Sequence, residues 1–183
     1  MTTGWDLPDA GADLDALYTP AFAAVHRAHF AGSPGVNPRL PVETRCHRHE
    51  SGWRGFFLLT PWMLAEIQVP DTVPETPLPP GWSAGERAEA PFVMLGPALR
   101  VSVGGSAVQA HLGYLPEVGH FLLRPLVQPL ESYASAEAVY EAWNGVVATR
   151  DRVQAEWREA AARAREAGER RLTRRELLGR LRG

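Results

Sequence analysis

The chain has 183 residues, of which 45% are hydrophobic and 22% charged, and a formal net charge of −2. This length predicts one domain with a proper core, and the charge excludes an overall attraction to nucleic acid or acidic membranes. Cys46 is the only cysteine, which excludes an intramolecular disulfide and fits a reducing compartment. There is no basic start followed by an apolar run, and no run approaches the about 20 residues that span a bilayer. We expect a soluble, cytoplasmic protein.

Positive charge is concentrated at the C-terminal end. All 19 basic residues are arginine, and residues 150–183 hold 11 of them against six acidic residues, a net charge of +5. The rest of the chain has eight arginines and 15 acidic residues, a net charge of −7. We expect residues 1–168 to form a single domain and residues 169–183 to form a basic tail.

The first half of the chain predicts a helix followed by strands. Apolar side chains recur at helical spacing over residues 13–30, and Pro20 lies inside this pattern, so the helix either begins at Pro20 or is kinked there. Short apolar runs then predict strands at residues 42–49, 53–59 and 64–69. The linkers between these runs are too short for a crossover helix, which predicts antiparallel neighbours. Thr60, Pro61 and Trp62 form a tight corner between the second and third strands.

The middle of the chain predicts a long loop and more strands. Residues 71–91 are proline-rich and predict a surface loop with Trp82 as its anchor. Short apolar runs predict further strands at residues 92–95, 99–103, 108–114 and 119–123, with Gly104-Gly105 as a hairpin turn between two of them. The prediction is an α+β fold: a mostly antiparallel sheet of about five or six short strands, flanked by an N-terminal helix and a long C-terminal helix.

The C-terminal helix is predicted from Ser135, a plausible N-cap, to about residue 167, with Gly168 as its terminator. Beyond Arg150 only Val153 and Trp157 are strongly apolar. The rest has high helix propensity and little to bury. We therefore expect the far part of this helix to be exposed.

The densest group of potential metal ligands is Cys46, His47, His49 and Glu50. A thiolate and two imidazoles suit zinc, copper or nickel, but a strand would place His47 and His49 on one face and Cys46 on the other. Surface histidines near a turn are the simpler interpretation. No serine elbow, phosphate-binding glycine loop or carboxylate pair occurs. We therefore predict no enzyme activity and assign no metal or cofactor.

Three blocks of the sequence resemble a known family. Residues 53–64, W-R-G-F-F-L-L-T-P-W-M-L, are similar to the signature of the HybE/HupJ family of NiFe-hydrogenase assembly chaperones. Residues 121–143 resemble the family more loosely, since Arg124-Pro125-Leu126 stands where a serine-proline pair is usual. The run T-R-R-E-L-L-G-R at residues 173–180 is similar to the family's C-terminal ending. The resemblance covers roughly residues 10–183.

The resemblance implies a cytoplasmic chaperone that binds the precursor of the hydrogenase small, iron–sulfur subunit. Binding of its twin-arginine signal would hold back export until maturation is complete. Other hydrogenase accessory proteins are further candidate partners; nucleic acid and membrane are not. The residues we expect to bind protein are Trp53, Thr60, Pro61, Trp62, Met63, Leu64, Arg174, Arg175, Leu177 and Leu178.

Several alternatives stay open at this point. Trp53 and Trp62 either line an apolar groove for the partner or belong to the core. The tail imitates a twin-arginine signal through Arg174 and Arg175, so it is a candidate to occupy the binding site when no precursor is present. The competing function is a metal-binding accessory protein of hydrogenase maturation that uses Cys46, His47 and His49, and a third is nucleic-acid binding through the arginine tail.

Overall fold

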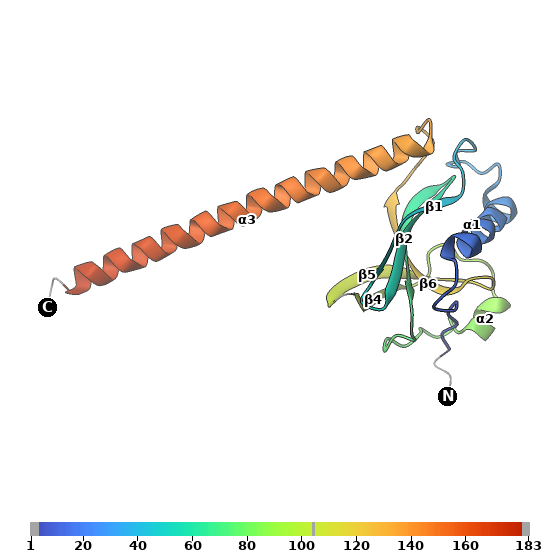
Figure 1. Ribbon diagram of the computed structural model, residues 1–183, viewed down its shortest axis with the longest axis horizontal. Coiled ribbons are helices and arrows are strands. Elements are labelled where there is room, and N and C mark those ends of the chain that lie inside the picture. Colours follow the sequence, from blue (N-terminus) through green and yellow to red (C-terminus); the bar gives the residue numbers. More distant parts are fainter. Residues whose placement is uncertain (1–3, 104, 181–183) are drawn as a thin grey trace. The chain divides into compact units, whose positions relative to one another are not determined.

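A computed structural model describes residues 4–103 and 105–180, with side chains of the last helix described as far as residue 165. The chain comprises two compact units, residues 1–139 and 140–183. In chain order the elements are α1 (Leu14–Val25), the π-helical turn η1 (His26–Phe30), β1 (Glu43–Glu50), β2 (Trp53–Thr60), β3 (Met63–Pro70), α2 (Ala84–Ala88), β4 (Ala98–Val103), β5 (Ser106–Leu115), β6 (Gly119–Val127) and α3 (Ala136–Arg180) (Figure 1).

The predicted N-terminal helix forms and begins before its proline. The Asp13 side chain caps α1 by accepting hydrogen bonds from the backbone N–H groups of Asp15 and Ala16, as N-cap residues do. Pro20 therefore lies inside the helix and does not start it. The buried residues follow one helical face: Leu14, Tyr18, Ala21, Phe22 and Val25.

Among the described residues, six strands form one antiparallel sheet in the order β1-β2-β3-β6-β5-β4. This confirms the predicted α+β class. The strand expected at residues 92–95 is absent from the structure, in which this stretch is irregular. Pro91 and Pro97 flank the stretch and cannot donate to a sheet ladder. Phe92 and Met94 instead pack against the core as partly buried side chains.

Each face of the sheet has its own hydrophobic cluster. Along β6, Phe121 and Leu123 belong to the cluster beneath α1, whereas Leu122 belongs to the second cluster, because successive strand residues point to opposite faces. Tyr18 is central to the first cluster, with its ring 5.0 Å from that of Phe56 and 5.6 Å from that of Phe121. The sheet is thus filled on both sides within residues 1–139.

The loop at residues 71–91 covers the second cluster. Trp82 packs against this cluster, as expected of an anchor, together with Leu78 and the N-terminal Trp5. A Cβ on Gly96 would lie 2.2 Å from the Trp82 ring, so only glycine allows this close approach. The loop also contains the short helix α2, which the sequence interpretation did not include. Ser83 and Glu86 form a capping box at its start.

A polar cluster ties three strands together. The Glu66 side chain on β3 is 6% exposed and pairs with Arg48 of β1 and with Arg124 of β6. A buried carboxylate is stable only when it is paired and hydrogen-bonded. Gln68 also donates to Glu66, at 3.3 Å. The ion pairs therefore satisfy a charge that the sheet would otherwise bury alone.

The last helix is longer than predicted. Ser135 accepts a hydrogen bond from the Ala138 N–H at 3.3 Å, which confirms the predicted N-cap. Gly168 does not end α3, which continues to Arg180. A single glycine costs a helix only about 1 kcal/mol, and the alanine, arginine and glutamate on either side favour helix.

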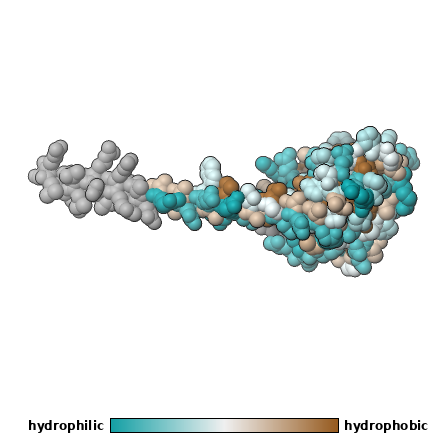
Figure 2. Space-filling view, turned by 90° about the horizontal axis from the view of Figure 1, so that it is seen from above, coloured by the Kyte–Doolittle hydropathy of each residue, from teal (hydrophilic) through white to brown (hydrophobic). Residues whose placement is uncertain are grey.

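The far part of α3 is exposed, as the sequence predicts. Trp157 is 75% exposed, and Val146 and Val153 are also exposed. Figure 2 shows mainly hydrophilic residues along the coloured part of this helix, with few hydrophobic ones between them. Within the described residues, no helix combines the length and apolar character that a membrane crossing requires.

Candidate protein-binding site

The corner at residues 60–64 is a tight hairpin buried in the core. Thr60 and Met63 pair across it; the Thr60 hydroxyl donates to the Met63 carbonyl at 2.9 Å and accepts from the Met63 N–H at 3.1 Å. Pro61 and Trp62 are the two turn residues, and the Pro61 carbonyl accepts from the Asn37 N–H at 2.8 Å. Thr60, Met63 and Leu64 have no exposed surface.

Trp62 packs against the end of the first helix. Its ring stacks on Phe30 at a centroid distance of 4.3 Å and on His26 at 5.8 Å, and the residue is 8% exposed. The corner thus faces the core in this conformation. Trp53 is half-buried against the second cluster. That these residues bind a partner stays a prediction.

The other predicted binding residues, Arg174, Arg175, Leu177 and Leu178, lie in the last turns of α3. Their side chains fall outside the part of the chain whose side chains the structure describes. Contact between these residues and a partner, and occupation of the binding site by the tail, stay predictions.

The histidines near Cys46 have separate partners. A β-bulge between Arg45 and Arg48 interrupts the alternation on which the expected faces of Cys46, His47 and His49 depended, and Cys46 has a φ of 58°. The His47 ring stacks on Phe56, whereas His49 pairs with Asp71 at 2.6 Å. Within the described residues, no three histidine, cysteine, aspartate or glutamate side chains are arranged to hold a metal ion.

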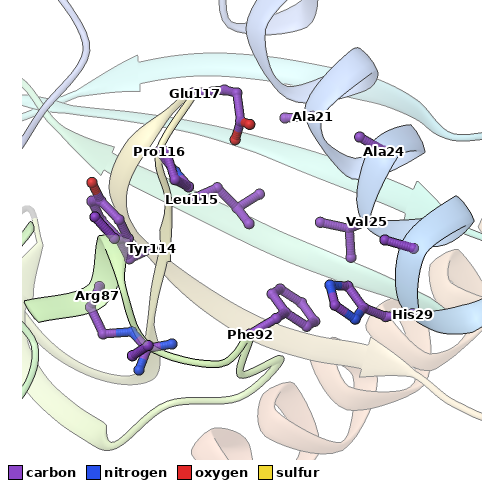
Figure 3. Close-up of a pocket in the computed structure, with 13 residues that line it drawn as sticks. Ala21, Ala24, Val25, His29, Arg87, Phe92, Tyr114, Leu115, Pro116 and Glu117 are labelled. Carbon is purple, nitrogen blue, oxygen red and sulfur yellow. The ribbon is translucent and has the colours of Figure 1, made fainter.

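A groove beside α1 is the strongest candidate site in the first unit. One wall is the α1–η1 face that carries short side chains. The other comes from the end of α2 and the segment after it, and from the end of β5 and the β5–β6 turn (Figure 3). Its volume is about 240 Å³. The lining residues are Ala21, Ala24, Val25, Ala28, His29, Arg87, Ala88, Ala90, Phe92, Tyr114, Leu115, Pro116 and Glu117.

The groove has an apolar floor and distinct ends. Figure 3 shows the Glu117 carboxylate toward the Ala21 end and His29 with Phe92 at the other end. The His29 and Phe92 rings stack at 4.7 Å, so they form a flat aromatic wall. Leu115 is buried in the floor. Such a mixture of apolar lining and few polar groups is typical of binding sites.

The charged groups at the groove differ in availability. Arg87 lies over the Trp82 ring at 4.7 Å and donates to the Pro91 carbonyl at 2.6 Å, which holds the side chain in place but leaves its positive charge at the groove. Burial, followed by the charges of Asp6 and Glu117, raises the pKa of Tyr114. Tyr114 is therefore neutral at physiological pH, and Glu117 is the acidic residue among those that line the groove.

A buried histidine positions this acidic end. His120 has no exposed surface; its Nδ1 accepts from the Asp6 N–H at 2.8 Å, and its Nε2 lies 2.8 Å from the Trp82 carbonyl, to which it donates. Burial lowers the pKa of His120, which favours the neutral ring that this pairing requires. His120 thereby joins the N-terminal segment to the loop beside the groove.

The sequence interpretation missed the groove residues. One signal was present: Ala21, Ala24 and Ala28 recur at helical spacing in the predicted first helix, which gives that helix a strip of small side chains. No local pattern indicated that Phe92 and Glu117 would face this strip, because they come from segments about 70 and 90 residues further along the chain.

The fold and groove define a small α+β protein with a partly apolar groove beside its first helix, and the comparisons supply the family. The chain belongs to the HybE family of NiFe-hydrogenase assembly chaperones, whose family model matches residues 13–180. The solution structure of HybE from Escherichia coli has a similar fold, with a TM-score of 0.52 and 18% sequence identity. The similarity covers 80% of this chain and 81% of that chain. Comparison with curated proteins gives no match.

Proposed function

We propose that this assembly chaperone acts in the cytoplasm and binds the precursor of a NiFe-hydrogenase small subunit. In this proposal the groove beside α1 holds the apolar part of the precursor's twin-arginine signal, and export waits until the hydrogenase is mature. The family supports the assembly role. The observation that carries the binding mode is an apolar groove with a carboxylate, Glu117, at one end.

The groove suits an amphipathic or apolar helix. The short side chains of Ala24 and Ala28 allow a second backbone to approach α1 closely, while Phe92 and Leu115 supply apolar contact surface. Helices that bind in grooves insert a few apolar anchors at helical spacing. A volume of about 240 Å³ accommodates two or three aliphatic side chains, not a folded domain.

The charge at the groove sets the direction in which a bound peptide helix would lie. Glu117 lies toward the Ala21 end, and its charge and that of Asp6 both contribute to the raised pKa of Tyr114. Arginine forms strong, bidentate hydrogen bonds with carboxylates. The paired arginines of a signal would therefore lie at the Glu117 end, and the apolar segment that follows them would run toward His29 and Phe92.

A binding measurement with synthetic signal peptides tests the proposal. The full chain is titrated with the small-subunit signal peptide and with the same peptide in which both arginines are alanine. We expect the native peptide to bind at least about tenfold more tightly, since two charge-assisted hydrogen bonds are lost. Equal binding of both peptides, or no binding of either, would overturn the proposed function.

A variant that fills the groove locates the site. Ala28→Trp places a large ring in the groove from an exposed position of η1, and Ala16→Trp is the matched control on α1 outside the groove. We expect only Ala28→Trp to abolish peptide binding, with both variants folded by circular dichroism. Loss of binding in neither variant would place the signal elsewhere on the chaperone.

A further inference from the structure

The two edges of the sheet differ in how they are protected. Edge strand β1 reads E-T-R-C-H-R-H-E, carries four charged residues and contains a bulge, which are the usual devices that prevent edge-to-edge pairing. Edge strand β4 reads A-L-R-V-S-V, carries one charge, Arg100, and pairs with β5 in regular register over all six residues. One edge is therefore blocked, and the other keeps the geometry that accepts a strand.

The backbone of β4 shows which groups are free. The Leu112 N–H donates to the Pro97 carbonyl, and antiparallel bonding alternates from residue to residue. Leu99, Val101 and Val103 therefore bond to β5, and the alternate residues, Ala98, Arg100 and Ser102, direct their backbone groups to the outer edge. Among the described residues, no backbone hydrogen bond joins β4 to a segment other than β5.

A cavity lies beside this edge. It has a volume of about 320 Å³ and is lined by Val101 and Ser102 of β4, by Trp53 of β2, and by loop residues that include Val73 and Glu75. Trp53 packs with Val101 in the second cluster, so the cavity opens on that face of the sheet. Trp53, Val73 and Val101 give it an apolar wall that one aliphatic side chain of an added strand can contact, whereas Glu75, Thr76 and Ser102 make the rest of the lining polar.

We propose that β4 binds an extended segment of a partner protein by strand addition, with an aliphatic residue of that segment in the cavity and an acidic residue beside it. In antiparallel pairing, directly opposite residues share a face. The residue opposite Val101 then points toward Trp53, and its neighbour, opposite Arg100, points to the exposed face. Opposite charges in such a pair attract, which selects an acidic residue at that position.

This second surface is independent of the groove and of the proposed signal binding. Strand addition draws affinity from main-chain hydrogen bonds and specificity from alternate side chains. The partner segment is thus extended and acidic-aliphatic, whereas the groove suits a helical, arginine-containing one. Both surfaces belong to the first unit, residues 1–139.

Amide exchange with a designed peptide tests the proposal. The probe is an eight-residue peptide that alternates isoleucine and threonine, with one central threonine replaced by glutamate. The control has identical side chains and is N-methylated on the amides that would face β4. We expect the probe, and not its N-methylated form, to slow exchange at the amides of Ala98, Arg100 and Ser102; those of Leu99, Val101 and Val103 are protected before the probe is added.

Charge exchange sharpens the result. Arg100→Glu should weaken binding of the glutamate probe about tenfold and strengthen binding of a probe with lysine at that position. Arg27→Glu, on the exposed surface of η1, should change neither. Strand addition is overturned if the N-methylated peptide binds equally well, if no probe binds at millimolar concentration, or if binding leaves the three outward amides unprotected. It is also overturned if rising protein concentration alone protects them, because a second copy then occupies the edge.

Discussion

The corner at residues 60–64 and the groove beside α1 are opposite in character. The corner carries the most distinctive stretch of the sequence, and yet Thr60, Met63 and Leu64 are fully buried. The groove is lined by ordinary residues, several of them alanine, and is open to a ligand. A distinctive sequence motif can therefore specify the scaffold, while the surface for a partner is assembled from ordinary segments.

The largest expected effect comes from the corner. Trp62→Ala should lower the free energy of unfolding by about 3–5 kcal/mol, because the ring is buried against Phe30 and His26 and its removal leaves a cavity. Urea unfolding measures the loss. Ala24→Leu, at an exposed groove position, should change stability by less than about 0.5 kcal/mol. A Trp62→Ala protein that kept its stability but no longer bound signal peptide would show that the corner serves binding and not the core.

A smaller loss of stability is expected from the polar part of the scaffold. Glu66→Ala removes the shared partner of Arg48 and Arg124. We expect a loss of about 2 kcal/mol, below the usual cost of breaking a buried pair, because both arginines reach solvent and are rehydrated. Glu43→Ala, which removes the surface pair with Arg45, is the control and should cost less than about 1 kcal/mol. Similar losses in both variants would show that the ion pairs of Glu66 contribute no more to stability than a surface ion pair does.

The pH dependence of stability tests the segment that adjoins the groove. Burial keeps the pKa of His120 below its ordinary value of 6.5. Above pH 6.5 the ring is neutral in both folded and unfolded chains; below it the unfolded chain binds a proton first, so stability should fall with pH down to the folded pKa. Urea unfolding at a series of pH values measures this slope. His120→Gln should lack this component, and an unchanged slope in that variant would contradict the assignment.

A substitution in the groove should have the smallest effect on stability and a measurable effect on peptide binding. Glu117→Gln should weaken the twin-arginine peptide about three- to tenfold and leave the urea midpoint unchanged, since Glu117 is exposed. Added salt should reduce the difference between the variant and the native chain. Glu89→Gln, which is exposed and outside the groove lining, provides the control. An equal effect of both substitutions would show that overall charge, not the groove, governs binding.

Much of the fold was predictable because it is local. Five of the strands have alternating or continuous apolar runs joined by short connections, and these signals do not depend on the rest of the chain. The prediction of a strand at residues 92–95 was wrong, because this stretch is an irregular segment between two prolines whose apolar side chains pack against the core. The end of α3 was also misplaced, because Gly168 is a weak terminator inside a strongly helical sequence.

The candidate site was much less predictable. The contact between His29 and Phe92 joins residues far apart in the chain, and it depends on the path of the loop that Trp82 anchors. The free edge of β4 depends on the order of strands in the sheet. Neither the His29–Phe92 contact nor the free edge of β4 can be predicted from the local periodicity of the sequence.

The first helix, the six strands of the sheet, the family and the concentration of arginine at the C-terminal end can all be read from the sequence. Three features depend instead on how the chain packs: Trp62 faces the core, the alanines of α1 and η1 line one groove with Phe92 and Glu117, and β4 is the open edge. A side chain's burial is set by the segment that packs over it, and in this protein those segments come from distant parts of the chain.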